Sequence, residues 1–418
     1  MTQARPSFRS VLNLTVLVAA LGYFVDIFDL LLFGIVRKAS LLSLGVPEAD
    51  TLRIGILLHN TQVWGLLAGG ILWGVLGDKR GRLSVLFGSI ALYSVANIAN
   101  AFVDVLPGLS AIQWYAVWRF LAGLGLAGEL GAAITLVGEV LPKEVRGYGT
   151  AVVAGVGVSG AVVANAVGKF MTWKSAYLVG GVLGLALLCL RIGVRESGMF
   201  ADMSRGDHKR GDFLSLFTSW ARFLRYLRCV LIGIPLWFGV GILMFYAPEF
   251  GKALGVTGPV TAGDAIAWCY TGLVIGDLGS GFLSQWLESR KKVVGLFLGL
   301  TLAGVLAYLH LPGLSPRAFY WICFANGIAF GYWAVFVTVA SEQFGTNLRA
   351  TVTTTAPNFV RAAVSPMSLT FLWLSANRGW GVVNAAMAVG LTTLVFAFWS
   401  LAYMDETHGK DLDFLEVS

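Results

Sequence analysis

Two aspartates lie in a stretch of sequence that otherwise suits the lipid interior of a membrane. The segment YFVDIFDLLLFG, residues 23–34, carries Asp26 and Asp29 three positions apart, so both side chains project from one face of a helix. A charged side chain at the centre of a bilayer costs about 2.5–3.5 kcal/mol on insertion scales, so such residues usually face a cavity or a partner. A buried carboxylate can hold a proton or, once ionised, pair with a cation. The two aspartates are therefore candidate proton-binding groups.

Arg119 is the first candidate partner, because it lies inside a predicted apolar span at a similar depth. At 1.5 Å per residue, Asp29 lies about 12 Å below the outer end of its span near Arg37. Arg119 stands at much the same depth in a span that begins near residue 111, so the two side chains can meet. We hypothesise that Asp29 carries a proton, while Asp26 either shares it or contacts the substrate. The alternative is a static buried ion pair that only fixes packing.

Arg361 is the second cation within a predicted span. It lies in TTTAPNFVRAAVSP between Pro357 and Pro366, and prolines loosen the helix hydrogen bonding where transporter helices bend. Asn358 lies on the same face, three residues earlier. An anionic group of a substrate is one candidate partner for Arg361. The alternatives are an ion pair with Asp277 or Glu249, or a lipid headgroup.

Other polar and aromatic residues are weaker candidates for the substrate site. His59 and Gln62 are three apart in the outer part of the second span, but a single histidine is more often a packing residue than a proton carrier. Glu129, in a glycine-rich stretch, either relays protons or makes a structural hydrogen bond. Aromatic residues at helical spacing usually pack or anchor a helix. Three of them are still candidates to line the second half of a cavity: Trp237, Tyr246 and Trp333.

The composition is that of an integral membrane protein. Of 418 residues, 57% are hydrophobic and 13% are charged, with a mean hydropathy of +0.75, whereas soluble domains carry about 25% charged residues. The net charge of +7 is spread over short loops, so it reports membrane topology and not a nucleic-acid surface. The chain contains no P-loop and no H-E-x-x-H motif. We therefore expect no enzyme activity, no cofactor, no metal and no nucleic-acid partner.

Apolar runs long enough to cross a bilayer recur along the chain. The twelve predicted spans are 10–36, 54–76, 84–103, 111–141, 147–170, 175–191, 228–248, 264–287, 293–310, 317–342, 350–374 and 380–403. With the N-terminus in the cytoplasm, 20 Lys and Arg residues are cytoplasmic, 8 lie outside and 2 lie within spans. This asymmetry predicts that both termini are cytoplasmic.

The spans divide into two halves. We expect an N-terminal six-helix bundle over 1–191, a cytoplasmic linker over 192–227, a C-terminal bundle over 228–404 and a cytoplasmic tail over 405–418. The end of the linker, DFLSLFTSWARFLRYLR, has the pattern of an interfacial amphipathic helix, with a plain charged linker as the alternative. Residues 125–147 also align with residues 327–350. Duplicated six-helix halves are typical of transporters whose substrate site lies between the halves.

Several motifs resemble those of one transporter family. The loop after the second span contains GVLGDKRGR, similar to the G-x-x-x-D-[RK]-x-G-[RK] signature of the major facilitator superfamily. RFLAGLGLAGELGAAITLVGEVLPKEVRG is similar to the fourth span of its metabolite:proton symporter and sugar porter branches, and the ending DETHGKDLDFLE to their PETKGK-type tail, with Asp405 replacing proline. The matching residues of the loop are Gly74, Asp78, Lys79, Arg80, Gly81 and Arg82; those of the fourth-span pattern include Arg119, Gly123, Glu129, Glu139 and Arg146.

The resemblance implies roles for these residues. In proton-coupled sugar porters an acidic residue of the first span faces an arginine of the fourth, which here implies Asp29 and Arg119. Glu139 and Arg146, with their counterparts Glu342 and Arg349, are implied to form a network that locks one conformation. Asp78 lies in a glycine-bounded turn, and we expect it to control conformation by pairing with a neighbouring arginine or a helix N-terminus; the alternative is a solvated loop that only sets topology. The chain departs from the pattern at Gln285, where the second half lacks an aspartate, and in the absence of the antiporter proline in the fifth span.

The sequence thus predicts an all-α membrane protein with twelve transmembrane helices in two pseudo-symmetric six-helix bundles, the major facilitator fold. The expected function is proton-coupled symport of a small polar metabolite, an organic anion or zwitterion, across the inner membrane by alternating access. One alternative is an exporter or antiporter of the same fold. Another is a membrane receptor or assembly protein without transport. The expected partners are the substrate, protons and the lipid bilayer, and the expected oligomeric state is a monomer.

Overall fold

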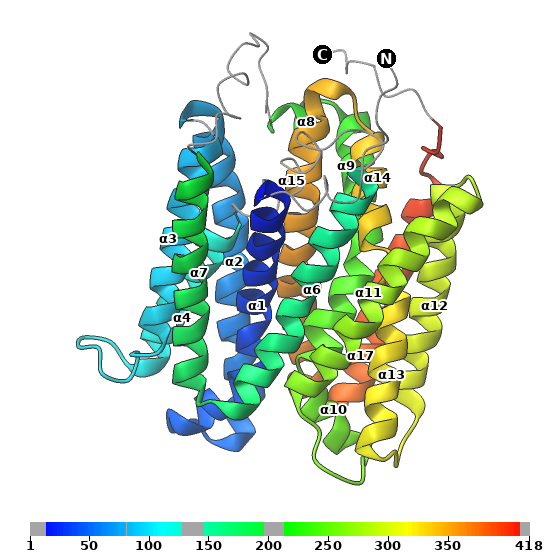
Figure 1. The fold of residues 1–418 in the computed structure, drawn as a ribbon. Coiled ribbons are helices and arrows are strands. Elements are labelled where there is room, and N and C mark those ends of the chain that lie inside the picture. The colour runs from blue at the N-terminus through cyan, green and yellow to red at the C-terminus, as the bar shows by residue number, and fades with distance from the viewer. Residues whose placement is uncertain (1–13, 81, 128–145, 196–212, 410–418) are drawn as a thin grey trace.

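The computed structural model describes residues 14–80, 82–127, 146–195 and 213–409 (Figure 1). The described residues form helices and contain no strand. The first half comprises α1 (Leu14–Ser43), α2 (Thr51–Arg80), α3 (Arg82–Asn100), α4 (Ala111–Leu126), α6 (Arg146–Phe170) and α7 (Trp173–Arg195). The second comprises α8 (Ser215–Thr218), α9 (Trp220–Phe238), α10 (Ala247–Ala253), α11 (Ala262–Trp286), α12 (Arg290–His310), α13 (Pro316–Phe330), α14 (Trp333–Glu342), α15 (Thr346–Ala362), α16 (Val364–Leu372) and α17 (Gly381–Ala402).

Eight helical segments of the described part are long and apolar enough to cross a membrane. Most of these segments begin and end within a few residues of the predicted spans. The first predicted span, however, ends too early. That span was expected to end at residue 36, yet α1 continues to Ser43. Arg37 is only 1% exposed, because Glu249 of the second half neutralises it at 2.6 Å. A buried, paired arginine therefore does not mark the end of the helix.

Three predicted spans of the second half are interrupted in the structure. The seventh was expected to begin at residue 228, but α9 begins at Trp220 and runs into a π-helical segment over Gly239–Met244. The tenth is divided into α13 and α14 at Gly331, where an added Cβ would overlap the backbone of Gly276 in α11. The eleventh is divided into α15 and α16 before Pro366. Such breaks are frequent where transporter helices line a functional site.

Close approach of α2 and α4 determines how the first half presents its polar groups. An added Cβ at Gly123 would overlap the backbone carbonyl of Gln62, so glycine is required for this contact. The contact lies one helical turn from Arg119 on α4. Backbone approach at Gly123 therefore brings Gln62 of α2 beside Arg119.

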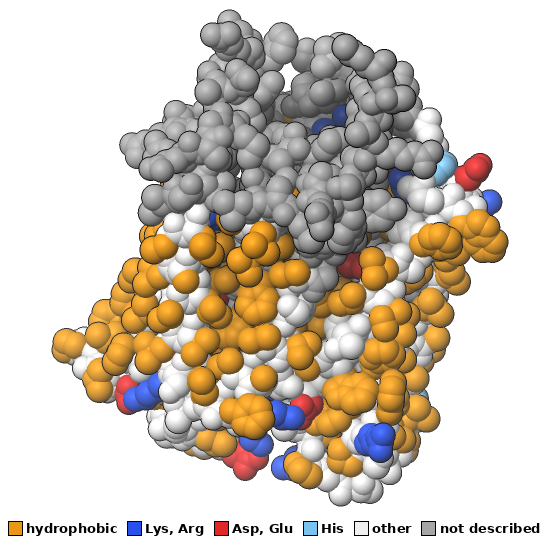
Figure 2. Space-filling view, in the orientation of Figure 1, with side chains coloured by type: hydrophobic (Ala, Val, Ile, Leu, Met, Phe, Trp, Pro, Cys, Tyr) orange, Lys and Arg blue, Asp and Glu red, His pale blue; other side chains and the backbone are white. Residues whose placement is uncertain are grey.

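The two halves meet along the centre of the molecule. Helix α6 packs against α11, and α2 packs against α15 and α16. Figure 2 shows apolar side chains over the lateral surface and charged side chains toward both ends of it. Phe282 of α11 and Val395 of α17 are exposed apolar residues, as expected for helices in contact with lipid.

Candidate functional site

Asp26 bridges the two halves. Its Oδ2 lies 3.5 Å from Arg361 Nη2 of α15, and both side chains are buried, at 0% and 2% exposure. Arg361 also stacks over the ring of Trp237, with its Cζ 5.5 Å from the ring centroid. The alternative partners considered for Arg361 are engaged elsewhere, since Asp277 Oδ1 accepts the Ala334 backbone N–H at the start of α14 and Glu249 pairs with Arg37. A charge pair thus spans the interface at the centre of the fold.

Asp29 points into the first half. Its carboxylate packs against Gly180 of α7, where an added Cβ would overlap Oδ1, and the side chain of Asn97 on α3 lies beside it. Asp29 is 1% exposed. The two aspartates therefore lie on one face of α1 but have different neighbours. Asp26 faces the second half, and Asp29 faces α3 and α7 of the first half.

Arg119 does not form the direct ion pair with Asp29 that its depth suggested. One guanidinium nitrogen donates to Gln62 Oε1 and the other to Tyr177 OH at 3.4 Å. The guanidinium lies over the ring of Phe33, with Cζ 4.3 Å from the ring centroid. Because α2 and α7 supply neutral acceptors on either side, Arg119 is held by a carbonyl and a hydroxyl. Among the described residues, no carboxylate oxygen lies within ion-pair distance of it.

The remaining substrate-site candidates occupy two regions. Trp237 and Trp333 form an edge-on pair with ring centroids 6.3 Å apart, and Asn358 is buried at 3% exposure on the helix of Arg361. His59 lies elsewhere, stacked on Phe245 of the second half at 4.7 Å between ring centroids. Tyr246 lies against Arg37, whose Cζ is 4.9 Å from its ring centroid. His59 and Tyr246 therefore belong to a closure between the halves.

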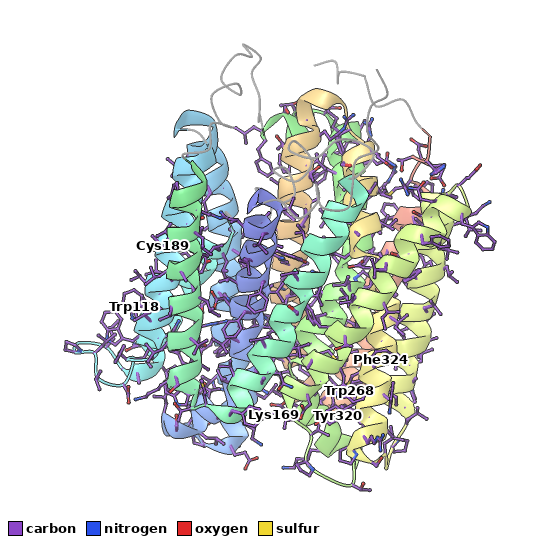
Figure 3. The ribbon with its side chains drawn as sticks, viewed as in Figure 1. Trp118, Lys169, Cys189, Trp268, Tyr320 and Phe324 are labelled. Carbon is purple, nitrogen blue, oxygen red and sulfur yellow. The ribbon has the colours of Figure 1, made fainter. Side chains whose placement is uncertain are left out.

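That closure lies at the end of the molecule away from the termini. The Arg37–Glu249 pair is accompanied by Lys169 Nζ of α6, which lies 2.5 Å from Asp264 Oδ1 of α11 (Figure 3 labels Lys169). Asn165 Nδ2 donates to the same oxygen at 3.1 Å. Deeper in the interface, Ser368 donates to Asn60 Oδ1 at 2.9 Å. In this structure the two halves are joined at that end.

The predicted gating residues lie at the opposite end, and the structure describes only some of them. Glu342 Oε1 lies 3.6 Å from Arg290 Nη2, and Arg349 Nε donates to the Ser341 carbonyl at 3.2 Å. Glu342 is thus paired with Arg290, which is not among the predicted gating residues. Gly74, Asp78, Lys79 and Arg80 end α2, Arg82 begins α3 and Arg146 begins α6, while Gly81, Glu129 and Glu139 lie outside the described residues.

Several residues of the site were missed in the sequence. Tyr115 lies one turn before Arg119 on α4, and Tyr177 lies three residues before Gly180 on α7, so helical spacing could have indicated both. The pairing of Arg37 with Glu249 had no such signal, because the two residues are 212 positions apart. Contacts between the halves depend on how the bundles meet, which residue spacing within one helix does not report.

Comparison with known proteins decides the family. Residues 12–365 match the residue pattern of the Major Facilitator Superfamily, which is most of the chain. The chain belongs to this superfamily. The superfamily assignment makes it a multi-pass membrane transporter of small molecules with the twelve-helix fold predicted from its sequence.

Individual members of the superfamily are similar over most of their length. The niacin transporter NiaP of Acinetobacter baylyi is 24% identical over 438 residues, covering 95% of this chain and 94% of that protein. The 3-(3-hydroxy-phenyl)propionate transporter of Escherichia coli is 26% identical over 297 residues, covering 66% and 72%. A solved D-xylose-proton symporter aligns with a TM-score of 0.69 at 18% identity, covering 95% and 99%, and at that identity it supports the fold alone.

Proposed function

We propose that this transporter takes up a small organic anion or zwitterion together with a proton, by alternating access. The observation that carries the proposal is the Asp26–Arg361 pair, buried at 3.5 Å between the two halves. An ion pair at such a place costs desolvation energy that packing alone does not require. It also joins the two elements that must separate when the halves rock about a central site.

The substrate group that we propose for Arg361 is a carboxylate. Within the described residues, Arg361 Nε and Nη1 have no hydrogen-bond acceptor, and neither does Trp237 Nε1 beside them. Buried donors without acceptors cost about 1–3 kcal/mol each, and a carboxylate can accept from two guanidinium nitrogens at once. The names of two relatives, the niacin and 3-(3-hydroxy-phenyl)propionate transporters, also refer to carboxylic acids. A neutral sugar would leave the charge of Arg361 without this partner.

The proton carrier that we propose is Asp29. An ionised Asp29 attracts Arg119, whereas a protonated Asp29 releases it to neutral acceptors. The arrangement of Arg119 on Gln62 and Tyr177, without an ion pair to Asp29, is the one expected for the protonated state. Two arrangements of Arg119 would then bias two conformations of the bundle.

The proposed orientation places both termini in the cytoplasm. The predicted cytoplasmic loops carry most of the Lys and Arg residues. The end closed by Arg37 and Glu249 then faces outward, and residues 192–227 and 405–418 face the cytoplasm. The proposed bundles are 1–191 and 228–404.

Transport into proteoliposomes tests the proposal. Purified protein is supplied with radiolabelled niacin, 3-(3-hydroxyphenyl)propionate or xylose, with the outside more acidic than the lumen. We expect accumulation of at least one of the two acids above its equilibrium level, and none of xylose. Accumulation only when the gradient is inverted would indicate an antiporter or exporter. Binding without any proton movement would indicate a receptor.

A further inference from the structure

Three hydroxyl groups form a continuous chain inside the first half. The Tyr177 and Tyr115 hydroxyls lie 2.9 Å apart, and Tyr115 donates to Ser40 Oγ at 3.2 Å. The three side chains come from α7, α4 and α1, and each is 0% exposed. A hydroxyl can donate and accept at the same time, so a chain of them can pass a proton along.

The inner end of the chain lies at the proposed proton site. Tyr177 OH accepts from Arg119 Nη1 at 3.4 Å. Gly180, which contacts the Asp29 carboxylate, follows Tyr177 by three residues on the same face of α7. The chain therefore ends beside Asp29, which itself is shielded from solvent.

The outer end of the chain approaches the surface at the end of the molecule away from the termini. Ser40 Oγ donates to the Arg37 carbonyl at 3.0 Å. Ser43 is exposed, lies about one helical turn further along α1, and donates to the Ser40 carbonyl at 2.8 Å. One turn of helix thus separates the last hydroxyl from solvent.

Two other buried tyrosines are bonded to the backbone. Tyr308 donates to the Leu243 carbonyl at 2.8 Å, and Tyr332 donates to the Ile232 carbonyl at 2.9 Å. A backbone carbonyl accepts a hydrogen bond but has no proton of its own to pass on. Bonding to the backbone is sufficient to satisfy a buried tyrosine, so packing does not demand a chain of three hydroxyls.

We propose that Ser40, Tyr115 and Tyr177 relay protons between the outer surface and Asp29 while the halves remain closed at that end. The relay rests on the proposed role of Asp29 as proton carrier. In an inward transfer a hydronium ion at the outer surface gives up one proton and becomes water. Ser40 takes this proton and gives its own to Tyr115, Tyr115 gives one to Tyr177, and Tyr177 gives one to the Asp29 carboxylate. Each hydroxyl loses one proton and gains one, and the only net new bond is the O–H bond on Asp29.

The hydroxyls must turn between one transfer and the next. After an inward transfer every hydroxyl points back toward Ser40. Rotation about the C–O bonds resets the chain for another proton.

The last step controls whether the relay conducts. No hydrogen bond joins Tyr177 to Asp29 among the described contacts, so the carboxylate must turn toward Tyr177 before the transfer is complete. A permanently joined chain would let protons leak and waste the gradient. Because no hydrogen bond joins Tyr177 to Asp29, the transfer depends on the position of the Asp29 side chain.

The experiment follows the infrared absorbance of protonated carboxyl groups after a rapid drop in pH, with the full chain in lipid nanodiscs. The Asp29→Asn variant identifies the part of the band due to Asp29. We expect Tyr115→Phe, Tyr177→Phe and Ser40→Ala to slow its appearance by about tenfold or more. Tyr308→Phe is the matched control, because it also removes a buried hydroxyl, and we expect the wild-type rate.

The outcomes separate the relay from the proposal on which it rests. A wild-type protein without an Asp29-dependent band would overturn the proton-carrier role and the relay with it. An Asp29-dependent band that forms at the wild-type rate in the three relay variants would overturn the relay alone. Thermal unfolding of each variant shows whether it is folded, and Ser40→Ala, which removes one oxygen atom, tests the relay with the smallest change.

Discussion

The two aspartates of α1 have separate partners although they are three residues apart. Asp26 faces Arg361 of the second half, and Asp29 faces Gly180 and Asn97 within the first. Residues at this spacing share a helix face but not one direction, and α1 lies where α7 and α15 approach it from different sides. The sequence identified these charged residues and their common depth. It did not identify Gln62 and Tyr177 as the acceptors for Arg119, because competition between neutral and charged partners is decided by packing.

Breaking the central ion pair from one side should destabilise the protein. Asp26→Asn or Arg361→Gln leaves one buried charge without its partner, and we expect a loss of about 3–5 kcal/mol in the free energy of unfolding. The double variant should lose less than the sum of the two. Denaturant unfolding in detergent micelles measures this, with Arg378→Gln as the control, because Arg378 is an exposed arginine that lies over the ring of Trp373. Additive losses would show that the two side chains do not interact.

Adding one methyl group at Gly180 should displace Asp29. Gly180→Ala places a Cβ where Oδ1 of Asp29 now lies, so the carboxylate must move or α7 must shift. We expect a loss of stability of about 1–3 kcal/mol and reduced proton-driven uptake. Gly299→Ala is the matched control, because it lies in α12 with no atom near the added methyl. Equal behaviour of the two variants in unfolding and uptake would contradict the placement of Asp29.

At the scale of the elements, α12 is attached to the segment that follows α17. Glu406 accepts from the Ser289 hydroxyl and from the first N–H groups of α12, at 2.9 Å for Arg290 and 3.2 Å for Lys291. The carboxylate satisfies helix donors that otherwise lack a partner and opposes the positive end of the helix dipole. Partial burial raises the pKa of Glu406, but hydrogen bonds from Ser289, His408 and α12 outweigh it and lower the pKa to about 2.

This attachment predicts a pH-dependent contribution to stability. Because the pKa in the folded state lies below the unfolded value of about 4.3, the contribution is present above that value and is lost as the pH falls toward about 2. Glu406→Gln should lower the free energy of unfolding at pH 7 by about 1 kcal/mol, a value discounted for solvent exposure. The difference should shrink at pH 3. The control is Glu288→Gln, at an exposed glutamate beside α12. We expect it to change the free energy of unfolding neither at pH 7 nor at pH 3.

The positions of the helices could be predicted from the lengths of the apolar runs in the sequence. The breaks within the helices could not. The predicted span 293–310 corresponds to α12, because an uninterrupted apolar run admits one interpretation. The predicted span 317–342 does not reveal the break at Gly331, since glycine is common in membrane helices. The break depends on contact with Gly276 and on Asp277 accepting from Ala334 at the start of α14. Both partners lie in another helix, which local sequence does not report.

At the scale of the whole molecule, the two halves are held together by charged pairs at one end. Arg37–Glu249 and Lys169–Asp264 both cross between the halves, whereas Lys38–Glu48 lies at the same end within the first half. Alternating access requires the crossing pairs to break and reform. Their loss should therefore favour the conformation that is open at this end.

Glu249→Gln should increase access to the interface. A cysteine introduced by Ser368→Cys, in a Cys189→Ser background, reports opening through its reaction with a membrane-impermeant maleimide. We expect reaction about tenfold faster in Glu249→Gln, for a loss of about 1.4 kcal/mol in the energy of closure. Glu48→Gln removes the exposed Lys38–Glu48 pair, which lies at the same end but does not join the halves, and should leave the rate unchanged. Equal rates in the two variants would show that the crossing pair does not hold the closure.

Proton-driven uptake by Asp29→Asn tests the central claim most directly. Proteoliposomes receive whichever labelled acid the wild type accumulates, niacin or 3-(3-hydroxyphenyl)propionate, with an acidic exterior, and exchange across equilibrated membranes is measured in parallel. We expect the Asp29→Asn variant to exchange the acid but no longer to concentrate it, because it has no carboxylate at this position to carry the proton. Accumulation by Asp29→Asn to the wild-type level would contradict the account.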